Sequence, residues 1–311
     1  MKKMRMLDAG ILVLWLKFCE IKGLGAQRVL KLLTIFQEIE TLLNARTEDL
    51  LDSRVFNNQM LQQWKELKEG SSEKYEEIIN KCNEHQIEIL PLFSSSYPIQ
   101  LKFLPEPPLT LFLQGNEDLL NTKKVAMAGS RSSNESSKKW AYNKAKELAE
   151  RGFTIVSGGA KGIDYEAHRA ALDVNGKTIC VLGTGFLNLY PPEHIALFKE
   201  IREKGLLISE IPPMNSGGRL ALLRRNRITS GISKALLQVT SSNDGGSLTQ
   251  LEIAFKQRIP IFAPSVNLGF EPFDGIIKSK QKFKINELED INSLIQILNK
   301  ENFFDNQTQK N

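Results

Sequence analysis

Two short apolar runs, separated by a longer amphipathic stretch, stand near the middle of the chain. Val125–Ala128 and Phe153–Val156 have the length and the side-chain character of buried parallel strands. Between them, Ser137–Arg151 has the spacing of a helix, with Ser136 or Ser137 available as its N-cap. The pattern therefore predicts one strand–helix–strand unit.

The same alternation continues toward the carboxyl terminus. Helical spacing and strand-length apolar runs follow one another at regular intervals. The predicted helices are 162–173, 193–204, 228–233 and 248–257, and the predicted strands are 177–182, 206–209, 235–240 and 260–263. Strands and helices that alternate at these lengths predict an α/β fold with a doubly wound, mostly parallel sheet.

The amino-terminal third has a different pattern. Residues 1–70 carry apolar residues three and four positions apart, which is typical of helices. The turn Gly23-Leu24-Gly25 resembles a helix-hairpin-helix element, in which backbone N–H groups face a phosphate. The alternative is an ordinary tight turn between two helices. Beyond it, 87–92 and 109–113 are predicted strands that extend the main sheet, joined by a proline-rich connector.

Charge is unevenly distributed along the chain. Residues 123–280 contain 23 Lys and Arg against 14 Asp and Glu, whereas the remainder contains 18 against 22. A polyanionic ligand would gain electrostatically at the sheet domain, although a merely solvated basic surface is the alternative. No apolar stretch reaches membrane-spanning length, and the three scattered cysteines indicate neither a disulfide framework nor a zinc site. We therefore expect a cytosolic protein without a membrane partner, a metal or a cofactor.

Glycine- and serine-rich loops follow the predicted strands, and the carboxyl ends of parallel strands are where open sheets bind ligands. Glycine permits close backbone approach, and amides at helix starts favour anions. The candidate phosphate-binding residues are Gly129, Ser130, Arg131, Gly158, Gly159, Lys161, Gly162, Arg219, Arg224, Arg227, Gly245, Gly246 and Ser247. No loop matches the dinucleotide fingerprint or the Gly-Lys-Ser/Thr phosphate loop, which disfavours nucleotide enzymes of the common kinds.

The cations among these candidates have different expected roles. Arg131 follows a buried strand, where it can clamp a phosphate bidentately or pair with a loop carboxylate. Lys161 stands at a helix start, where its charge opposes the helix dipole and indicates an anionic partner. On a helical turn, Arg224 and Arg227 share a face and Arg225 points elsewhere. We expect two or three of the clustered arginines, Arg219 included, to reach the ligand and one to make an internal pair.

Four further residues lie close to the candidate loops. Asp164, in the first turn of its helix, is interpreted as structural, and His168 as a packed, hydrogen-bonded residue rather than a base. Phe186 and Tyr190 follow the Gly183-Thr184-Gly185 loop. They are candidates for stacking on nucleic-acid bases, or for a hydrophobic lid on the sheet edge.

Several motifs occur in an order that resembles the DprA/Smf family of DNA-processing proteins. The motifs are Tyr97-Pro98, Pro107-Pro108, Gly129-Ser130-Arg131, Ala160-Lys161-Gly162-Ile163-Asp164, Ala167-His168, Tyr190-Pro191-Pro192-Glu193, Ser209-Glu210, Arg225-Asn226-Arg227-Ile228 and Gly246-Ser247-Leu248. The resemblance implies a cytoplasmic, dimeric, non-catalytic protein that binds single-stranded DNA and loads a RecA-type recombinase in natural transformation. It assigns DNA contacts to Arg131 and, by spacing, to Arg219.

The resemblance also implies a domain organisation. It predicts a helical SAM-like or helix-hairpin-helix domain over residues 1–85 and an extended Rossmann-like domain over 86–285, through which the homodimer forms. Residues 286–311 are then a carboxyl-terminal helix and polar tail, without the winged helix of many relatives.

The stretch 244–252 favours a rival interpretation. It partly resembles a loop of the lysine-decarboxylase-like phosphoribohydrolases, in which Thr249 and Glu252 would match. Leu248 stands where that group has glycine and Asp244 where it has proline. Cleavage of a nucleoside monophosphate is therefore disfavoured, while a nucleotide-binding sensor without turnover remains the alternative function.

Overall fold

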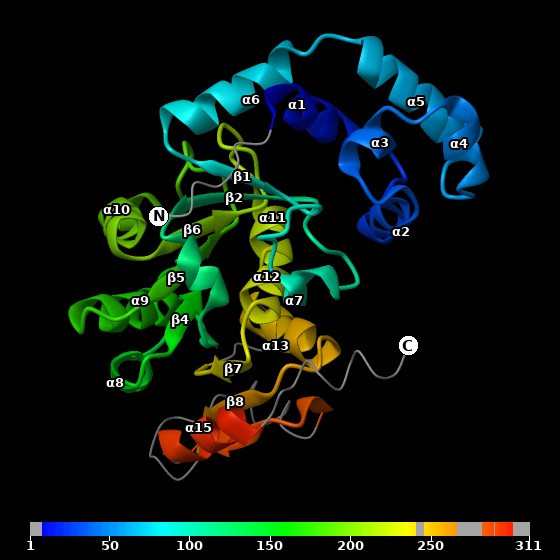
Figure 1. Ribbon diagram of the computed structural model, residues 1–311. Coiled ribbons are helices and arrows are strands. Elements are labelled where there is room, and N and C mark those ends of the chain that lie inside the picture. The colour runs from blue at the N-terminus through cyan, green and yellow to red at the C-terminus, as the bar shows by residue number, and fades with distance from the viewer. Residues whose placement is uncertain (1–7, 241–245, 266–281, 289, 301–311) are drawn as a thin grey trace. The chain divides into compact units, whose positions relative to one another are not determined.

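A computed structural model of the chain describes residues 8–240, 246–265, 282–288 and 290–300 (Figure 1). The chain forms two compact units. The first comprises residues 1–97 and 105–112, and the second comprises residues 98–104 and 113–311. The predicted domain boundary at residue 85 falls inside the first unit, because the strand that follows it groups with the helices.

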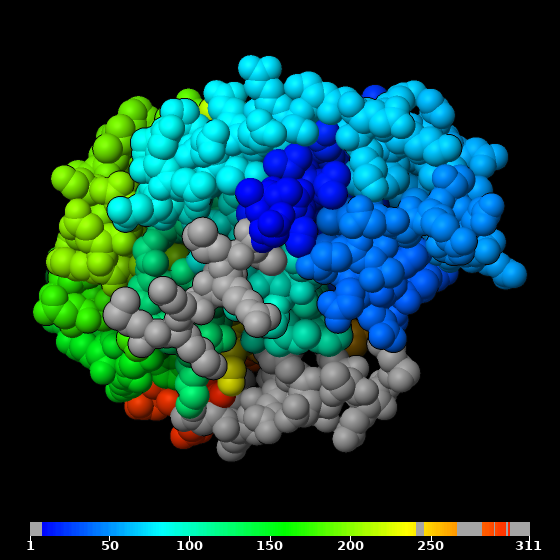
Figure 2. Space-filling view, turned by 45° about the horizontal axis from the view of Figure 1, so that its top comes forward, coloured from blue at the N-terminus to red at the C-terminus, as the bar shows by residue number. Residues whose placement is uncertain are grey.

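The first unit consists mainly of helices around an aromatic core. Phe18 lies at its centre, with its ring stacked on Trp15 and edge-on to Trp64. The buried Trp15 indole donates to Thr110 Oγ1 at 2.9 Å. In the space-filling view these helices, blue to cyan, form one unbroken surface (Figure 2). The elements are α1 (Ala9–Phe18), α2 (Ala26–Phe36), α3 (Ile39–Leu43), α4 (Thr47–Asp52), α5 (Asn58–Glu69), α6 (Glu73–Glu84) and β1 (Glu88–Pro91).

The second unit alternates strands and helices as the apolar pattern predicts. This unit includes α7 (Ile99–Lys102), and β2 (Thr110–Gly115) is divided between the two units. The elements that follow are β3 (Lys124–Ala128), α8 (Glu135–Glu150), β4 (Thr154–Ser157), α9 (Ile163–Asp173), β5 (Thr178–Leu182), α10 (Ile195–Lys204), β6 (Leu206–Ser209), α11 (Arg219–Arg224), α12 (Asn226–Gly231), β7 (Ala235–Gln238), α13 (Gly246–Lys256), β8 (Ile261–Pro264), β9 (Asn286–Leu288) and α15 (Ile291–Lys300). Short 3₁₀ turns cover Glu117–Asn121 and Pro192–His194.

The strands form one sheet in the order β1-β2-β6-β5-β4-β3-β7-β8-β9, and every pair from β6 to β9 is parallel. Strands β3 to β6 are added in one direction and β7 to β9 in the other. The direction of addition therefore reverses between β3 and β7, which makes that junction the topological switch point of the sheet. The predicted fold class, a doubly wound and mostly parallel α/β sheet of the extended Rossmann-like kind with an amino-terminal helical region, is confirmed.

Alternate residues of β3 enter two different cores. Val125 and Met127 pack with α8, α9 and α15, whereas Ala126 and Ala128 pack with α13 on the opposite face. Figure 1 shows α8 and α9 on one side of the strands and α12 and α13 on the other. Because both faces are covered, the strand is apolar at every position except its first.

Three local details differ from the sequence-based expectation. Asn134 caps α8, two and three residues before the predicted serines, because its side chain accepts the Ser137 N–H at 2.8 Å. Strand β9 was not predicted, because three residues with only Leu288 buried carry no alternating signal. A helix that was not predicted, α11, begins at Arg219.

Within the described ranges, no helix combines the length and the apolarity that crossing a membrane requires.

Replacing Asn134 with alanine should lower the free energy of unfolding by about 1 kcal/mol, because the first turn of α8 loses its side-chain acceptor. Urea denaturation of the wild type and the variant measures this difference. Asn134→Asp keeps the acceptor and serves as the control. An alanine variant as stable as the wild type would contradict the assigned cap.

Candidate nucleic-acid interface

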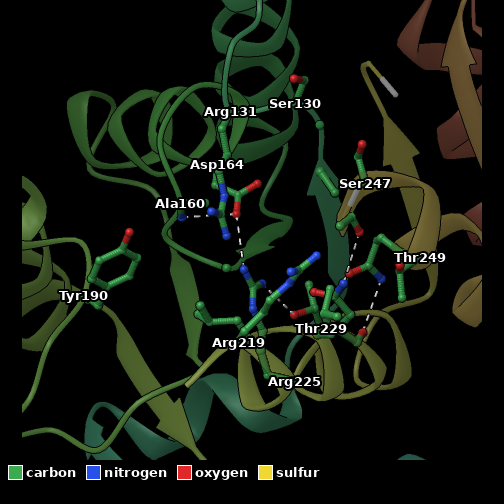
Figure 3. A pocket seen from close by; sticks show the side chains of 18 of the residues that line it. Ser130, Arg131, Ala160, Asp164, Tyr190, Arg219, Arg225, Thr229, Ser247 and Thr249 are labelled. Carbon is green, nitrogen blue, oxygen red and sulfur yellow. Dashed lines mark hydrogen bonds and ion pairs between the residues drawn. The ribbon is translucent and has the colours of Figure 1, made fainter. Parts of the chain in front are cut away.

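A cavity of about 1270 Å³ opens at the switch point of the sheet. The loops that follow β3, β4, β5 and β6 contribute to its wall, together with α11, α12 and the start of α13. Figure 3 shows side chains from these separate segments pointing into one common space. All of the lining residues belong to the second unit.

Close packing joins the loops after β3 and β4. A Cβ atom on Gly129 would lie 2.4 Å from Ile163, and one on Gly162 would lie 2.5 Å from the Ser130 carbonyl oxygen. Gly162 also has φ +75°, which disfavours any side chain there. The Ser130 N–H donates to Thr240 Oγ1 at 2.6 Å, which ties the end of β3 to the end of β7. These contacts fix the backbone that carries Arg131.

Two arginines line the cavity without an anionic partner in the part of the chain that the structure describes. Arg131 follows β3 and Arg219 begins α11, and both are exposed. Figure 3 shows both side chains directed toward the same cavity. Two guanidinium groups from different loops thus supply positive charge that no described carboxylate neutralises. Arg224 is exposed but does not line the cavity.

Arg225 lines the cavity, as was expected of Arg224 and Arg227. It was expected to point away, yet it lines the cavity and is only 9% exposed. Its Nη2 lies 3.5 Å from Asp164 Oδ2, and its Nη1 donates to Thr229 Oγ1 at 3.4 Å. Its Nε is buried without a partner among the described residues. A buried donor left unpaired costs about 1–3 kcal/mol, so this arrangement is destabilising on its own.

Arg227, predicted to bind phosphate, instead makes the internal pair. Its guanidinium donates to both carboxylate oxygens of Glu210, at 2.8 and 2.5 Å, and the residue is 9% exposed. Arg224 and Arg227 were expected to share a face of one helix. They belong to different helices, because α11 ends at Arg224 and α12 begins at Asn226, and Arg225 lies at the junction. Arg227 does not line the cavity in this structure, and its contact with the ligand stays a prediction.

Lys161 also pairs within the protein and does not line the cavity. Its ammonium contacts the Glu193 carboxylate. The hydrogen bond and the opposite charge raise the pKa of Lys161 and lower that of Glu193. The predicted anionic partner exists as an internal carboxylate. Gly159 and Gly162 likewise shape the loop rather than face the cavity.

The start of α13 forms another wall. Gly246 and Ser247 line the cavity as predicted from the glycine-rich stretch, while Gly245 lies outside the described residues. Asn226 connects this wall to α12, because its side chain donates to the Gly246 carbonyl oxygen at 3.3 Å and its own carbonyl accepts from Gln250 at 3.2 Å. These bonds hold the two helices against each other at the cavity.

The two candidate stacking residues differ in exposure. Phe186 is 6% exposed and does not line the cavity, so its ring is buried in the protein in this structure and its stacking on a base stays a prediction. Tyr190 is 50% exposed and lines the cavity at one side (Figure 3). An aromatic face is therefore available to a base at Tyr190.

His168 is fully buried behind the cavity, and its Nδ1 lies 2.7 Å from Thr178 Oγ1. The Thr178 hydroxyl donates to the Ile155 carbonyl oxygen, so it accepts from the histidine, which carries its proton on Nδ1. Burial, with the Arg225 charge, lowers the pKa of His168 to about 3. Burial also raises the pKa of the Cys180 thiol. Neither group is arranged as a base or a nucleophile.

Metal binding finds no support in the described part of the chain, where no group of three or more His, Cys, Asp and Glu side chains converges. The chemistry that the cavity offers is recognition of anions, by arginines, hydroxyls and backbone amides.

The geometry defines a doubly wound α/β protein with an arginine-lined cavity at its switch point. A family model described as DNA recombination-mediator protein A matches residues 88–296. The chain belongs to this DprA/Smf family.

Relatives and solved structures agree with this assignment. Protein Smf from a Synechocystis species is 30% identical over 253 residues, which cover 80% of this chain and 63% of that protein. The X-ray structure of DNA processing protein A from Streptococcus pneumoniae matches with a TM-score of 0.78 and 27% identity, covering 94% of this chain and 98% of that one. DNA processing protein A from Helicobacter pylori, whose structure concerns its single-stranded DNA binding mode, matches with a TM-score of 0.62 and 29% identity over 69% of this chain and 96% of that one.

Stability should fall as the pH is lowered from about 6.5 toward 3. Within that window the unfolded state protonates His168 and the folded state does not, so the free energy of unfolding falls by up to about 1.4 kcal/mol per pH unit from this group. In His168→Asn, which keeps a donor for Thr178, this share of the slope should disappear. Urea unfolding of both proteins at several pH values tests this, and parallel pH profiles would contradict it.

Proposed function

We propose that this protein binds single-stranded DNA at the switch-point cavity and acts as a recombination mediator. The observation that carries the proposal is the pair Arg131 and Arg219, which come from different loops and line one cavity without carboxylate partners among the described residues. Family membership and the single-stranded DNA binding of the Helicobacter pylori relative support the nature of the ligand.

The recognition chemistry favours the sugar-phosphate backbone. Guanidinium groups match phosphate oxygens, and such contacts carry no sequence information. A flexible single strand can follow a concave surface that a stiff duplex cannot enter. Tyr190 adds an exposed ring beside the arginines, on which any base can stack. Binding should therefore be independent of sequence and stronger for single strands than for duplexes.

The wider role follows from the family. We propose that the protein acts in the cytoplasm as a homodimer formed through the 86–285 domain and loads a RecA-type recombinase onto bound strands during natural transformation or homologous recombination. The description of the family as recombination mediators supports this role. We assign no catalytic step to the site, since burial lowers the pKa of His168 and raises that of the Cys180 thiol.

One observation favours a nucleotide-sensing role. Thr249 and Glu252, the two residues that match the phosphoribohydrolase loop, both line the cavity. Incubation with nucleoside monophosphates distinguishes these functions. Release of free base that is lost in Glu252→Gln would favour a phosphoribohydrolase, and binding of the monophosphate without release would favour the sensor. DNA binding with neither supports the mediator.

Arg131 and Arg219 are the exposed arginines at the rim of the cavity. Reversing both charges, by Arg131→Glu with Arg219→Glu, should weaken binding of oligo-dT roughly 100-fold or more, because two charge-assisted phosphate contacts become repulsive. The slope of log affinity against log salt should become shallower by about 1.4, at about 0.7 per contact. Fluorescence anisotropy across salt concentrations measures both quantities.

Arg202→Glu provides the control for net charge, because Arg202 is exposed on α10 and does not line the cavity. Unchanged affinity after the double reversal would remove the proposed interface.

A further inference from the structure

Arg225 and Arg227 are equally buried and two residues apart, but their guanidinium groups have different surroundings. Arg227 is saturated on one side by the two oxygens of Glu210. Arg225 has five N–H donors. In the described part of the chain it makes one hydrogen bond, at 3.4 Å, and one ion pair, at 3.5 Å. Its Nε is buried without a partner. A charged group at nine-tenths burial with spare donors indicates a ligand that supplies the missing acceptors.

Packing and polar contacts hold the Arg225 guanidinium in place. A Cβ atom on Gly158 would lie 1.5 Å from Nη1 and 1.7 Å from both Cζ and Nη2 of Arg225, so the guanidinium rests on the bare Gly158 backbone. Asp164 fixes one side of the group, and is itself held by the Ala160 N–H at 3.2 Å. Thr229 fixes another side (Figure 3). The group is thus aimed at the cavity that Arg225 lines.

A second unpartnered polar group lines the same cavity. Thr184, 4% exposed, lines the cavity, and its hydroxyl has no hydrogen-bond partner among the described residues. A planar guanidinium with free donors and an unpaired hydroxyl, both lining one cavity, are groups that bind a tetrahedral oxyanion. The rim arginines Arg131 and Arg219 are exposed, whereas these two groups are buried.

We propose that Arg225 and Thr184 form a second, deeper phosphate subsite, which takes one internal phosphodiester of a strand held at the rim. The inference rests on the proposed function. The charge of the subsite selects the diester, because Asp164 balances Arg225 and leaves little net charge for a doubly charged terminal phosphate. A singly charged diester accepts hydrogen bonds from the unpaired donors of Arg225. A second negative charge would be repelled by Asp164. The strand therefore enters the cavity by at least one nucleotide.

Gly158→Ala tests the subsite without removing any charge. The new methyl group displaces the Arg225 guanidinium, and the fold tolerates the change because the clash involves the end of a flexible side chain and the Gly158 backbone lies outside the left-handed region. We expect a roughly 10-fold weaker affinity for oligo-dT, with a circular dichroism spectrum like that of the wild type and a lower Tm, because the buried Asp164 loses its partner. Arg225→Lys, which keeps the charge but loses the planar fork, should weaken binding to a similar degree.

Combination of variants separates a direct role from a structural one. Arg225→Ala should reduce the salt slope by about 0.7, the value for one phosphate contact. Adding Gly158→Ala to Arg225→Ala should cause no further loss, because both act on the same contact, whereas adding Arg219→Ala should multiply the losses. Arg202→Lys, exposed on α10, is the control for the arginine-to-lysine exchange.

The results separate failure of the deep subsite from failure of the proposed function. If the wild type binds oligo-dT and both Gly158→Ala and Arg225→Lys bind it equally well with an unchanged slope, the deep subsite is refuted while the proposed function stands. If the wild type itself does not bind, the proposed function fails. Oligo-dT with a 5′-hydroxyl should bind as tightly as oligo-dT with a 5′-phosphate. A gain from the 5′-phosphate that disappears in Arg225→Ala would overturn the assignment to an internal diester.

Discussion

The reversal of strand order between β3 and β7 is the constraint on which the site depends. Parallel strands end at the same edge of a sheet, and where successive connections leave to opposite faces no helix covers that edge. The Ser130 N–H bond to Thr240 spans this point and keeps the ends of β3 and β7 together. Gly129 and Gly162 let the loops after β3 and β4 approach each other across it. The cavity follows from this topology, and its chemistry follows from the side chains that reach it.

The distribution of internal ion pairs decides which cations remain for a ligand. Arg227 is held by Glu210 and Lys161 by Glu193, so these positive charges are used within the protein. Arg131 and Arg219 have no such partner among the described residues. Arg225 is intermediate, because its ion pair with Asp164 leaves N–H donors without an acceptor among the described residues. Carboxylates placed elsewhere therefore decide which of these cations are left to a ligand.

The fold could be predicted from the sequence because its signals are local. Each buried strand carries a short apolar run, and each helix carries its own spacing and end signals, so the order of elements defined the fold class. The short β9 was missed because it lacks such a pattern. The cap at Asn134 was missed because Ser136 and Ser137 carry an equally suitable side chain nearby.

The site was predictable in part. The residue types of Arg131, Arg219 and Ser247 after strands or at helix starts indicated cavity positions, and the structure places all three there. The roles of Arg225 and Arg227 were exchanged, because a break between α11 and α12 changes which side chains share a face. The partner of Arg227, Glu210, stands 17 residues away on another loop, and no local pattern predicts that pair.

The most direct test of this account is the structure of the protein bound to oligo-dT. The account predicts successive phosphates at Arg131 and Arg219, with the strand entering the switch-point cavity. A strand bound on a surface remote from the carboxyl ends of β3 and β7, with this cavity left to solvent, would contradict it.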